Sequence, residues 1–461
     1  MKRFINTIKN IYSIEELRKR ILYTLGIVLI YRVGSYISLP GIDVAALSHT
    51  AFRSSSSEGL LGLLNMFTGN AFSNASIFAL GIMPYISASI VVQLLTLVVP
   101  FFQRLQKEGE SGRKKINQMT RFLTIAVTAL QAPAYLSNMV RTVGVNSGVF
   151  HTFTGEVITT DVLPVSFIIV SMIVLISSTL FIMWLGERIT EKGIGNGISL
   201  IIMVGIMARL PFALAAEFAS KVSETGNGGP IIFLLELLLL VAVILISILL
   251  VQGTRKVPVQ YAKRVVGNKQ YGGQRQYLPL KVNAAGVMPI IFAQAIMFLP
   301  LTIMGFASNR ESIGVVAAAL SNHEGFWYNF IFAIMIIAFT YFYTAITFNP
   351  TQIADDMKKN GGFIPGIKPG KKTVDFIDNI ISRITLPGSI FLAFVAIMPS
   401  FARMFGINSQ FAQFFGGTSL LIMVGVVLDT LQQIESHLLM RHYDGLTKSG
   451  RIKGRSPLPV S

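Results

Sequence analysis

The stretch Pro230-Ile-Ile-Phe-Leu-Leu-Glu-Leu-Leu-Leu-Leu-Val-Ala-Val-Ile-Leu-Ile-Ser-Ile-Leu-Leu-Val-Gln252 decides the fold of this chain. It matches the roughly 20 apolar residues that an α-helix needs to cross the hydrocarbon core of a bilayer. Backbone polar groups in lipid must be paired within the segment, so we expect a transmembrane helix. Arg255 and Lys256 follow directly, and basic flanks of this kind stay on the cytoplasmic side.

Nine further apolar stretches give ten predicted spans in all. They cover residues 21–39, 75–99, 119–139, 163–184, 195–214, 230–252, 285–305, 327–347, 384–402 and 415–436. Of the 39 Lys and Arg residues, 31 lie in every second gap between the spans or in the terminal segments, and Arg121 lies at the adjoining end of the third span, which makes 32 on one side. This alternation predicts that both termini are cytoplasmic. Charged residues make up only 13% of the chain and hydrophobic residues 52%, which excludes an ordinary soluble protein. We therefore predict an all-α membrane protein.

The net charge of +17 belongs to the predicted cytoplasmic face. It suits anionic lipid headgroups, nucleic acid or an acidic protein partner, although topology alone also accounts for much of such a surplus. The chain has no cysteine, which excludes disulfides and thiolate metal sites. The basic N-terminal segment 1–20 precedes an apolar stretch without a small-residue cleavage pattern, so we do not interpret it as a removed signal peptide.

Five predicted spans lie on each side of a polar connection, residues 215–229. With an odd number of spans per half, the second half enters from the opposite face, which is the topology of an inverted repeat. The predicted halves are residues 21–214 and 230–436, followed by a cytoplasmic tail, 437–461. The two halves share no convincing residue-level match, so chance equality of span number is the alternative interpretation.

Residues 60–74 precede the second span and begin with the apolar stretch Leu60–Thr68, about half the length of a span. An apolar helix too short to cross is expected to be re-entrant or buried. A surface amphipathic helix is the alternative.

Two predicted cytoplasmic loops, residues 253–284 and 348–383, are rich in Lys and Arg and carry turn-forming Gly and Pro. The pattern Val257-Pro-Val-Gln-Tyr-Ala and the pair Gly272-Gly273 predict an ordered hairpin in the first loop. Basic, partly rigid loops suit phosphate backbones or a docking protein.

The sequence shows no catalytic constellation. None of the five histidines forms a metal pair at helical spacing, and no P-loop, nucleophile elbow or zincin motif occurs. We predict no enzyme activity and no cofactor. Glu236 is the plainest ionisable residue within a span, and it could serve an ion-coupled carrier or snorkel to the outer interface. A secondary transporter of a small solute is therefore the alternative function, and a membrane-embedded protease or acyltransferase is a second one.

Several motifs resemble a known family. They are Phe78-Ala-Leu-Gly-Ile-Met-Pro-Tyr-Ile-Ser-Ala-Ser89, Trp184-Leu-Gly-Glu-Arg-Ile-Thr-Glu-Lys-Gly-Ile-Gly-Asn-Gly-Ile-Ser199, Leu278-Pro-Leu-Lys-Val-Asn-Ala-Ala-Gly-Val-Met-Pro289, Phe348-Asn-Pro350, Phe363-Ile-Pro-Gly-Ile367 and Gly416-Gly-Thr-Ser-Leu-Leu-Ile422. In this order, and with ten spans, they resemble the SecY family of protein-conducting channels from Ser13 to Arg441.

The resemblance implies two five-helix halves around an hourglass pore with an aliphatic waist. The six waist positions carried over are all isoleucine: Ile82, Ile86, Ile198, Ile202, Ile291 and Ile422. It also implies that segment 60–74 is a plug that seals the outer funnel and swings aside during translocation. The plug residues carried over are Leu60, Leu61, Leu63, Leu64, Met66, Phe67 and Gly69.

The family also has a lateral gate between its second and third spans and its seventh and eighth. Polar residues expected there are Ser87, Gln93, Gln131, Asn283 and Gln294. The two basic loops would dock the ribosome or the motor ATPase SecA, through Arg255, Lys256, Lys263, Arg264, Lys358, Lys359 and Lys368. The family usually has Arg where this chain has Lys368, which keeps the charge but loses the bidentate fork.

The function implied is a passive channel in the bacterial plasma membrane. It would move unfolded secretory polypeptides across and release transmembrane segments sideways into lipid. Signal sequences, SecE and SecG subunits, SecA, the ribosome and anionic lipids are the partners that the resemblance implies.

Overall fold

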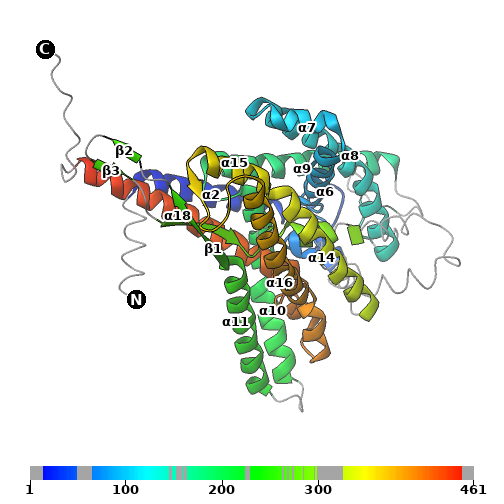
Figure 1. The fold of residues 1–461 in the computed structure, drawn as a ribbon. Coiled ribbons are helices and arrows are strands. Elements are labelled where there is room, and N and C mark those ends of the chain that lie inside the picture. Colours follow the sequence, from blue (N-terminus) through cyan, green and yellow to red (C-terminus); the bar gives the residue numbers. More distant parts are fainter. Residues whose placement is uncertain are drawn as a thin grey trace. The chain divides into compact units, whose positions relative to one another are not determined.

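The computed structural model describes most of the chain as helix (Figure 1). The described residues are 14–48, 65–144, 148–151, 158, 164–223, 229–261, 264–266, 269–271, 275–283, 285–294, 296–297 and 325–448. The helices of the first half are α2 (Glu15–Gly34), α3 (Val44–Ser48), α6 (Met83–Val98), α7 (Pro100–Lys107), α8 (Glu110–Val143), α9 (Val165–Lys192) and α10 (Gly197–Ser223). Those of the second half are α11 (Gly229–Gln252), α14 (Phe326–Thr347), α15 (Pro350–Lys359), α16 (Lys371–Met404), α17 (Ser409–Ala412) and α18 (Gly417–Lys448).

Among the described residues, six helical stretches are long and apolar enough to cross a membrane, and α6 with α7 would make a seventh. The six include α9, α10, α11, α16, the first part of α18, and α14 together with α15. The axes of α6 and α7 differ by 98°. The bend falls at Val99, whose extended backbone (φ −96°, ψ 118°) is what a following proline favours. The predicted second span ends at this same residue.

The start of the predicted second span, residues 75–82, is not helical. This segment forms turns, and α6 begins only at Met83, with Pro84 in its first turn. Its backbone pairs with the chain that follows α2: Leu39 N–H donates to Ala75 O (2.9 Å) and Ile77 N–H donates to Ile37 O (2.8 Å). The positive φ of Ala75 (45°) and of Gly81 (55°) is also incompatible with a continuous helix.

The fifth span is longer than the apolar pattern predicts. Helix α10 continues to Ser223, through a part of the connection 215–229 that the sequence marks as polar. Glu217 and Lys221 lower the hydropathy of this end, but both side chains are buried. The polar residues therefore form part of the helix packing.

The first basic loop, residues 253–284, folds as β-structure. Strands β1 (Thr254–Tyr261) and β4 (Arg275–Lys281) are antiparallel, with Thr254 opposite Lys281 and Gln260 opposite Arg275. Strands β2 (Arg264–Val266) and β3 (Lys269–Tyr271) form a second antiparallel pair. The predicted hairpin in residues 253–284 is thus confirmed.

The chain divides into two compact units. Unit 1 contains residues 14–48, 65–206 and 426–448 of the described chain, and unit 2 contains residues 207–425. In unit 1, α8 packs on α6, α7 and α9, and α2 packs on α9. In unit 2, α14 packs along α16, and the strands β1 and β4 form one sheet. Helices α10 and α18 each contribute residues to both units.

Candidate channel elements

The described part of the predicted plug is residues 65–74, in unit 1. It forms one short helical turn at residues 65–67 and then a series of turns. Met66 and Phe67 are buried, at 1% and 6% exposure. Asn65 organises the turns, because its carbonyl accepts from Asn70 N–H (3.0 Å) and its side-chain Oδ1 accepts from Ser73 N–H (3.1 Å). Four predicted plug residues lie outside the described residues: Leu60, Leu61, Leu63 and Leu64.

Helix α2 holds this segment through one charged side chain. Arg32 Nη1 donates to Gly69 O at 2.8 Å, and Arg32 Nη2 donates to the hydroxyl of Tyr36 at 2.8 Å. The guanidinium also lies over the Tyr36 ring, 4.8 Å from its centroid. A hydrogen bond from a charged donor to a carbonyl is stronger than a neutral one. Arg32 therefore fixes the turn at Gly69.

Helix α10 approaches the same turn at glycine. A Cβ atom on Gly205 would lie 2.6 Å from Phe67 O, and one on Gly69 would lie 3.1 Å from Gly205 Cα. Gly69 also has a φ of 63°, which favours glycine. Two glycines facing each other thus let the segment pack directly against the helix backbone. Arg32 lies within the predicted span 21–39 and Gly205 within the predicted span 195–214, and neither was predicted to hold the plug.

Four of the six waist isoleucines belong to unit 1. Ile82 caps the N-terminus of α6 and is buried at 3% exposure, and Ile86 lies one turn later and is half-buried. Ile202 on α10 is 4% exposed. Ile198, one turn earlier on α10, is half-buried and packs at the close approach of α10 to Gly186 of α9. Ile198 and Ile202 thus lie one turn apart on α10, whereas Ile82 precedes the first residue of α6.

The other two waist isoleucines belong to unit 2. Ile291 is half-buried on a helical segment, residues 288–294, and Ile422 is 3% exposed in the second turn of α18. All six side chains lie on or next to a helix and none is fully exposed. The ring that they would form remains a prediction.

The predicted gate residues of unit 1 make local contacts. The Ser87 hydroxyl donates to Met83 O (3.2 Å) within α6, and Gln93 Nε2 donates to Ser89 Oγ (3.5 Å) in the same helix. Gln131 is half-buried on α8, which packs on α6. In unit 2, Asn283 and Gln294 are buried at 8% and 9% exposure. Asn283 Oδ1 has no hydrogen-bond partner among the described residues.

The two basic loops form one module, which the sequence did not predict. Strand β5 (Gly362–Phe363) from the second loop pairs with the end of β1, with Gln260 opposite Phe363, so one three-stranded sheet has the order β4-β1-β5. A separate hydrophobic core lies beneath it, built from side chains of both loops and of the start of α16. Its buried members are Val257, Val259, Leu280, Met357, Ile364 and Ile377.

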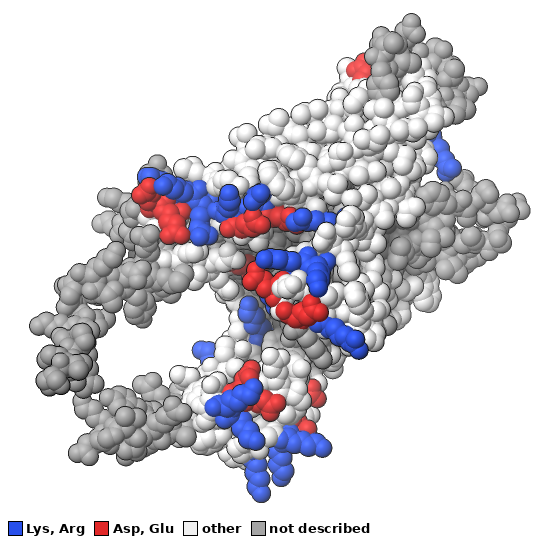
Figure 2. Space-filling view, turned by 90° about the horizontal axis from the view of Figure 1, so that it is seen from above, with Lys and Arg blue, Asp and Glu red and all other residues white. Residues whose placement is uncertain are grey.

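This module presents its basic side chains to solvent. Arg255, Lys256, Lys358, Lys359 and Lys368 are all exposed. Arg264 lies in β2, and Lys263 lies outside the described residues. Acidic residues occur among the basic ones, as in the pair Lys359–Asp356 (3.7 Å). Figure 2 shows Lys and Arg gathered with Asp and Glu over limited parts of one face, while broad areas carry neither.

Glu236 does not snorkel outward. Its side chain is buried in unit 2, 3.3 Å from Lys221 Nζ, and Lys221 is also 3.5 Å from Glu217. Lys221 donates to Gly406 O (3.0 Å), and Glu217 Oε2 accepts from Asn408 N–H (2.9 Å). The three side chains thus bind α10 and α11 to the loop between α16 and α17. The expectation that Glu236 reaches the interface is wrong, because a buried ammonium is within reach.

No group of three or more His, Cys, Asp or Glu that could hold a metal ion occurs among the residues that the structure describes. The arrangement is that of a helical membrane protein with buried polar junctions, a helix-anchored turn segment and a basic β-module.

Comparison with known proteins identifies the family. The family model described as SecY matches residues 76–431. The protein translocase subunit SecY of Mycobacterium tuberculosis (strain ATCC 25618 / H37Rv) is 41% identical to this chain, and the match covers 97% of this chain and all of the relative. The SecY subunit of Streptomyces coelicolor is 40% identical, over 95% of this chain and 98% of the relative. The SecY subunit of Chlamydia trachomatis is 41% identical, over 97% of this chain and 99% of the relative.

The solved structure described as that of a protein conducting channel is 17% identical with a TM-score of 0.62, covering 91% of this chain and 92% of the other. Sec61 from the canine ribosome-channel complex is 16% identical with a TM-score of 0.58 and the same coverage. At this identity the structures show a shared fold, with which the ten predicted spans agree. By its sequence relatives and its family model, this chain belongs to the SecY family.

Proposed function

We propose that this chain is the protein-conducting subunit of a bacterial protein translocase. It moves unfolded secretory polypeptides across the plasma membrane and releases transmembrane segments laterally into lipid. The observation that carries the proposal is near full-length identity of 40–41% to proteins named protein translocase subunit SecY. Both termini are cytoplasmic, in agreement with the alternation of Lys and Arg.

The waist is a ring of Ile82, Ile86, Ile198, Ile202, Ile291 and Ile422. Aliphatic side chains cannot replace the hydration shell of an ion, so a narrow ring of them blocks ions by dewetting. Branched side chains can still move aside for a peptide of variable size. Segment 60–74 is the plug, and its described end is positioned by Arg32 and Gly205. The residues Ser87, Gln93, Gln131, Asn283 and Gln294 contribute to a lateral gate that signal sequences open.

The basic module is the cytoplasmic docking surface for the ribosome or SecA. Its exposed side chains come from β1 (Arg255 and Lys256), from α15 (Lys358 and Lys359) and from the turn before α16 (Lys368). These elements share one hydrophobic core, so the charges are held in a defined arrangement. Such a surface favours phosphate backbones and acidic protein surfaces. SecE and SecG subunits and anionic lipids complete the complex.

Crosslinking tests the proposal directly. A photoreactive side chain at Ile86 or Ile291 is expected to crosslink to an arrested translocating polypeptide. The matched control is Ile231 on α11, whose side chain is 79% exposed and expected to face lipid. Equal crosslinking from all three positions, or crosslinks to lipid alone from Ile86 and Ile291, would overturn the assignment of the waist.

A further inference from the structure

A buried cluster of three ionisable side chains joins α10 to α11 within unit 2. Glu217 and Lys221 lie one turn apart on α10, and Glu236 lies on α11. The side chains of Glu217, Lys221 and Glu236 are 0%, 5% and 6% exposed. Lys221 Nζ is 3.5 Å from Glu217 Oε1 and 3.3 Å from Glu236 Oε1. Two carboxyl groups therefore share one ammonium group.

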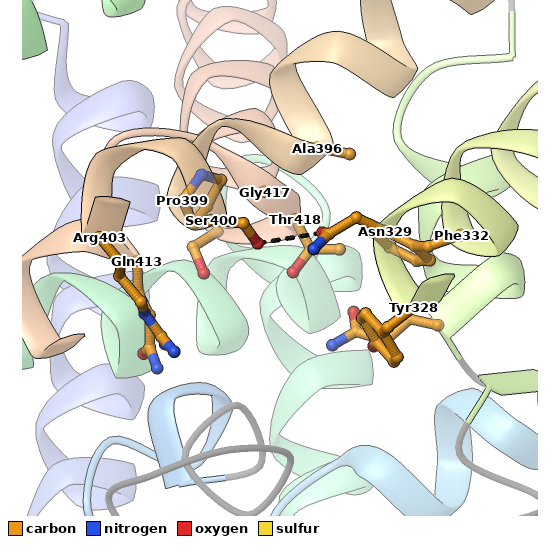
Figure 3. Close-up of a pocket in the computed structure, with 12 residues that line it drawn as sticks. Tyr328, Asn329, Phe332, Ala396, Pro399, Ser400, Arg403, Gln413, Gly417 and Thr418 are labelled. Atoms are coloured by element: carbon orange, nitrogen blue, oxygen red, sulfur yellow. Dashed lines mark hydrogen bonds between the residues drawn. The ribbon is translucent and has the colours of Figure 1, made fainter. Parts of the chain in front are cut away.

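Lys221 is the only cation that pairs with either glutamate in the part of the chain that the structure describes. Helix α11 carries no second ionisable residue, and the loop of residues 405–408 carries none. The next charged residues along the elements that meet here are Arg209, two turns earlier on α10, and Arg403, at the end of α16. Neither pairs with the glutamates, and Arg403 lines a pocket between α14, α16 and α18 (Figure 3). Glu224, which follows α10, lies outside the described residues.

Each glutamate has one buried carboxyl oxygen without a hydrogen-bond partner among the described residues. These atoms are Oε1 of Glu217 and Oε2 of Glu236. Lys221 forms an ion pair with the former but no hydrogen bond. The two carboxyl groups lie within hydrogen-bonding reach of each other. Two carboxyl groups in such contact away from water do not both ionise, because like charges repel, and they share one proton instead. A proton between them gives both buried oxygens a partner.

The charge balance of the cluster points to the same ligand. Two ionised carboxylates and one ammonium leave one uncompensated negative charge in a buried site, which is costly. A bound proton makes the cluster neutral. A metal cation fits less well, because the ammonium of Lys221 repels it. Calcium also takes about 6–8 oxygen ligands, more than two carboxyl groups supply.

We propose that this cluster is a proton-binding site, in which Glu236 is protonated in the folded protein at neutral pH and shares its proton with Glu217. Glu217 Oε2 accepts a hydrogen bond from Asn408 N–H (2.9 Å). An ionised carboxylate is the stronger acceptor of such a bond, so the negative charge belongs to Glu217. Protonated Glu236 then donates from Oε2 to Glu217 Oε1, and Lys221 neutralises the remaining charge.

The proton also affects the loop between α16 and α17. Lys221 and Glu217 hold this loop through Gly406 O (3.0 Å) and Asn408 N–H. Loss of the proton leaves a buried negative charge, so we expect the cluster to separate and the loop to be released at high pH. The site shares no residue with the proposed waist, plug, gate or docking surface. Its occupancy is measured without polypeptide translocation, so failure of one proposal leaves the other standing.

Infrared spectroscopy of the purified full chain in detergent tests the proposal. A protonated carboxyl group has a C=O stretch that is separate from the bands of an ionised carboxylate. At neutral pH this band should be present in the parent and lost in Glu236→Gln, because glutamine replaces the protonated acid with little change in shape or charge. Glu110→Gln, at an exposed glutamate in the first turn of α8, is the matched control and should keep the band.

A pH titration of stability gives an independent measurement. A glutamate in the unfolded chain is ionised above about pH 5, so unfolding releases the proton there. The folded state then binds more protons than the unfolded state, and stability falls as the pH rises. Relative to Glu236→Gln, the folding equilibrium constant of the parent should fall by up to about tenfold per pH unit. Glu217→Gln should remove both signals too, since one carboxylate then remains with one ammonium.

Absence of a protonated-carboxyl band from the folded parent at neutral pH overturns the proposal without any variant. Folded Glu236→Gln and Glu217→Gln variants that keep the band and the pH slope of the parent overturn it equally. Thermal unfolding shows whether each variant is folded, and Glu217→Gln serves if Glu236→Gln does not fold. A third contrary result is stabilisation of the parent, but not of Glu236→Gln, by sodium or calcium chloride over choline chloride at equal ionic strength. A metal cation would then fill the site in place of the proton.

Discussion

Two loops in this protein are each held to neighbouring helices by hydrogen bonds between side chains and the loop backbone, but those side chains are neutral in one loop and ionised in the other. In unit 1, residues 193–196 lead into α10, and neutral side chains bind their backbone: Thr24 Oγ1 accepts from Ile194 N–H (3.1 Å) and Gln433 Oε1 accepts from Gly195 N–H (2.9 Å). In unit 2, residues 405–408 lead toward α17 and α18. There the partners are ionised side chains, Lys221 on Gly406 O and Glu217 on Asn408 N–H.

We call each loop together with its partner side chains a junction. The two junctions also correspond in which helices supply the partner side chains. Thr24 lies on the first helix of the first half and Gln433 on the last helix of the second half. Glu236 lies on the first helix of the second half, and Lys221 and Glu217 on the last helix of the first half. This exchange is what the inverted topology of the predicted halves requires. Because the partners are neutral in one junction and ionised in the other, we expect substitutions of the partner side chains to cost more stability in the ionised junction.

The largest effect is expected for Lys221→Met. The change leaves Glu217 and Glu236 buried without their ammonium partner. Removing one member of a buried ion pair costs about 3–5 kcal/mol, because the remaining charge is uncompensated. Thermal and dodecyl sulfate unfolding of the purified chain should show a large loss of stability.

Lys192→Met is the control for Lys221→Met, since Lys192 is exposed at the end of α9 and should change stability by no more than about 0.5 kcal/mol. Combining Lys221→Met with Glu217→Gln and Glu236→Gln should recover much of the loss, because no buried charge is then left unpaired. Equal stability of Lys221→Met and the control would show that the ionic junction is not stabilising.

Arg32→Gln should have the next largest effect. Arg32 resembles Lys221 in donating from a cation to a glycine carbonyl, but it is only half-buried. A hydrogen bond to a charged group contributes about 1.5–3 kcal/mol, and partial exposure places this one at the lower end. We expect a loss of about 1.5 kcal/mol and, because the plug turn is released, a higher resting ion conductance in planar bilayers.

Arg141→Gln serves as the control for Arg32→Gln, because Arg141 is exposed in the last turn of α8. Unchanged conductance in a folded Arg32→Gln variant would contradict the role of Arg32 in holding the plug. Gly205→Ala offers an independent route to the same turn, since its Cβ would meet Phe67 O.

The apolar pattern predicted the helices well where composition alone decides them. The predicted span 230–252 and helix α11 differ by one residue, because every turn of that helix is apolar. The pattern failed at residues 75–82 and 215–223. In both places the structure depends on partners distant in the sequence. The segment after α2 determines the backbone of residues 75–82. Glu236 and the 405–408 loop keep the polar side chains of residues 215–223 buried.

Among the candidate channel elements, too, features with a local sequence signal could be predicted, and features that depend on distant partners could not. The hairpin in residues 253–284 could be predicted from local turn and strand signals, whereas the pairing of β1 with β5 joins loops about a hundred residues apart and leaves no local signal. Arg32 carried a signal, because a charge within a span is expensive and so marks a function. Its partner, a backbone carbonyl at Gly69, has no side chain by which a sequence could reveal it.

In the neutral junction, Gln433→Ala should have a smaller effect than either charged variant. A neutral hydrogen bond contributes about 1 kcal/mol net, and the freed Gly195 N–H keeps only part of its solvation. Unfolding should show a loss of about 1 kcal/mol. Gln432→Ala, on the exposed neighbouring residue, should show almost none. A loss above about 3 kcal/mol for Gln433→Ala would remove the difference between the two junctions.

The smallest loss of stability is expected for Asp356→Asn. This variant removes an ion pair that is charged like the ionic junction but exposed to solvent. Lys359 and Asp356 form an ammonium–carboxylate pair on α15 at 3.7 Å, with side chains 77% and 57% exposed. Exposed pairs contribute about 0–1 kcal/mol, because water screens both charges. Unfolding of Asp356→Asn should therefore match the parent within about 0.5 kcal/mol. If this variant instead lost as much as Lys221→Met, charge alone would explain the ionic junction, and burial would not be what distinguishes it from the neutral one.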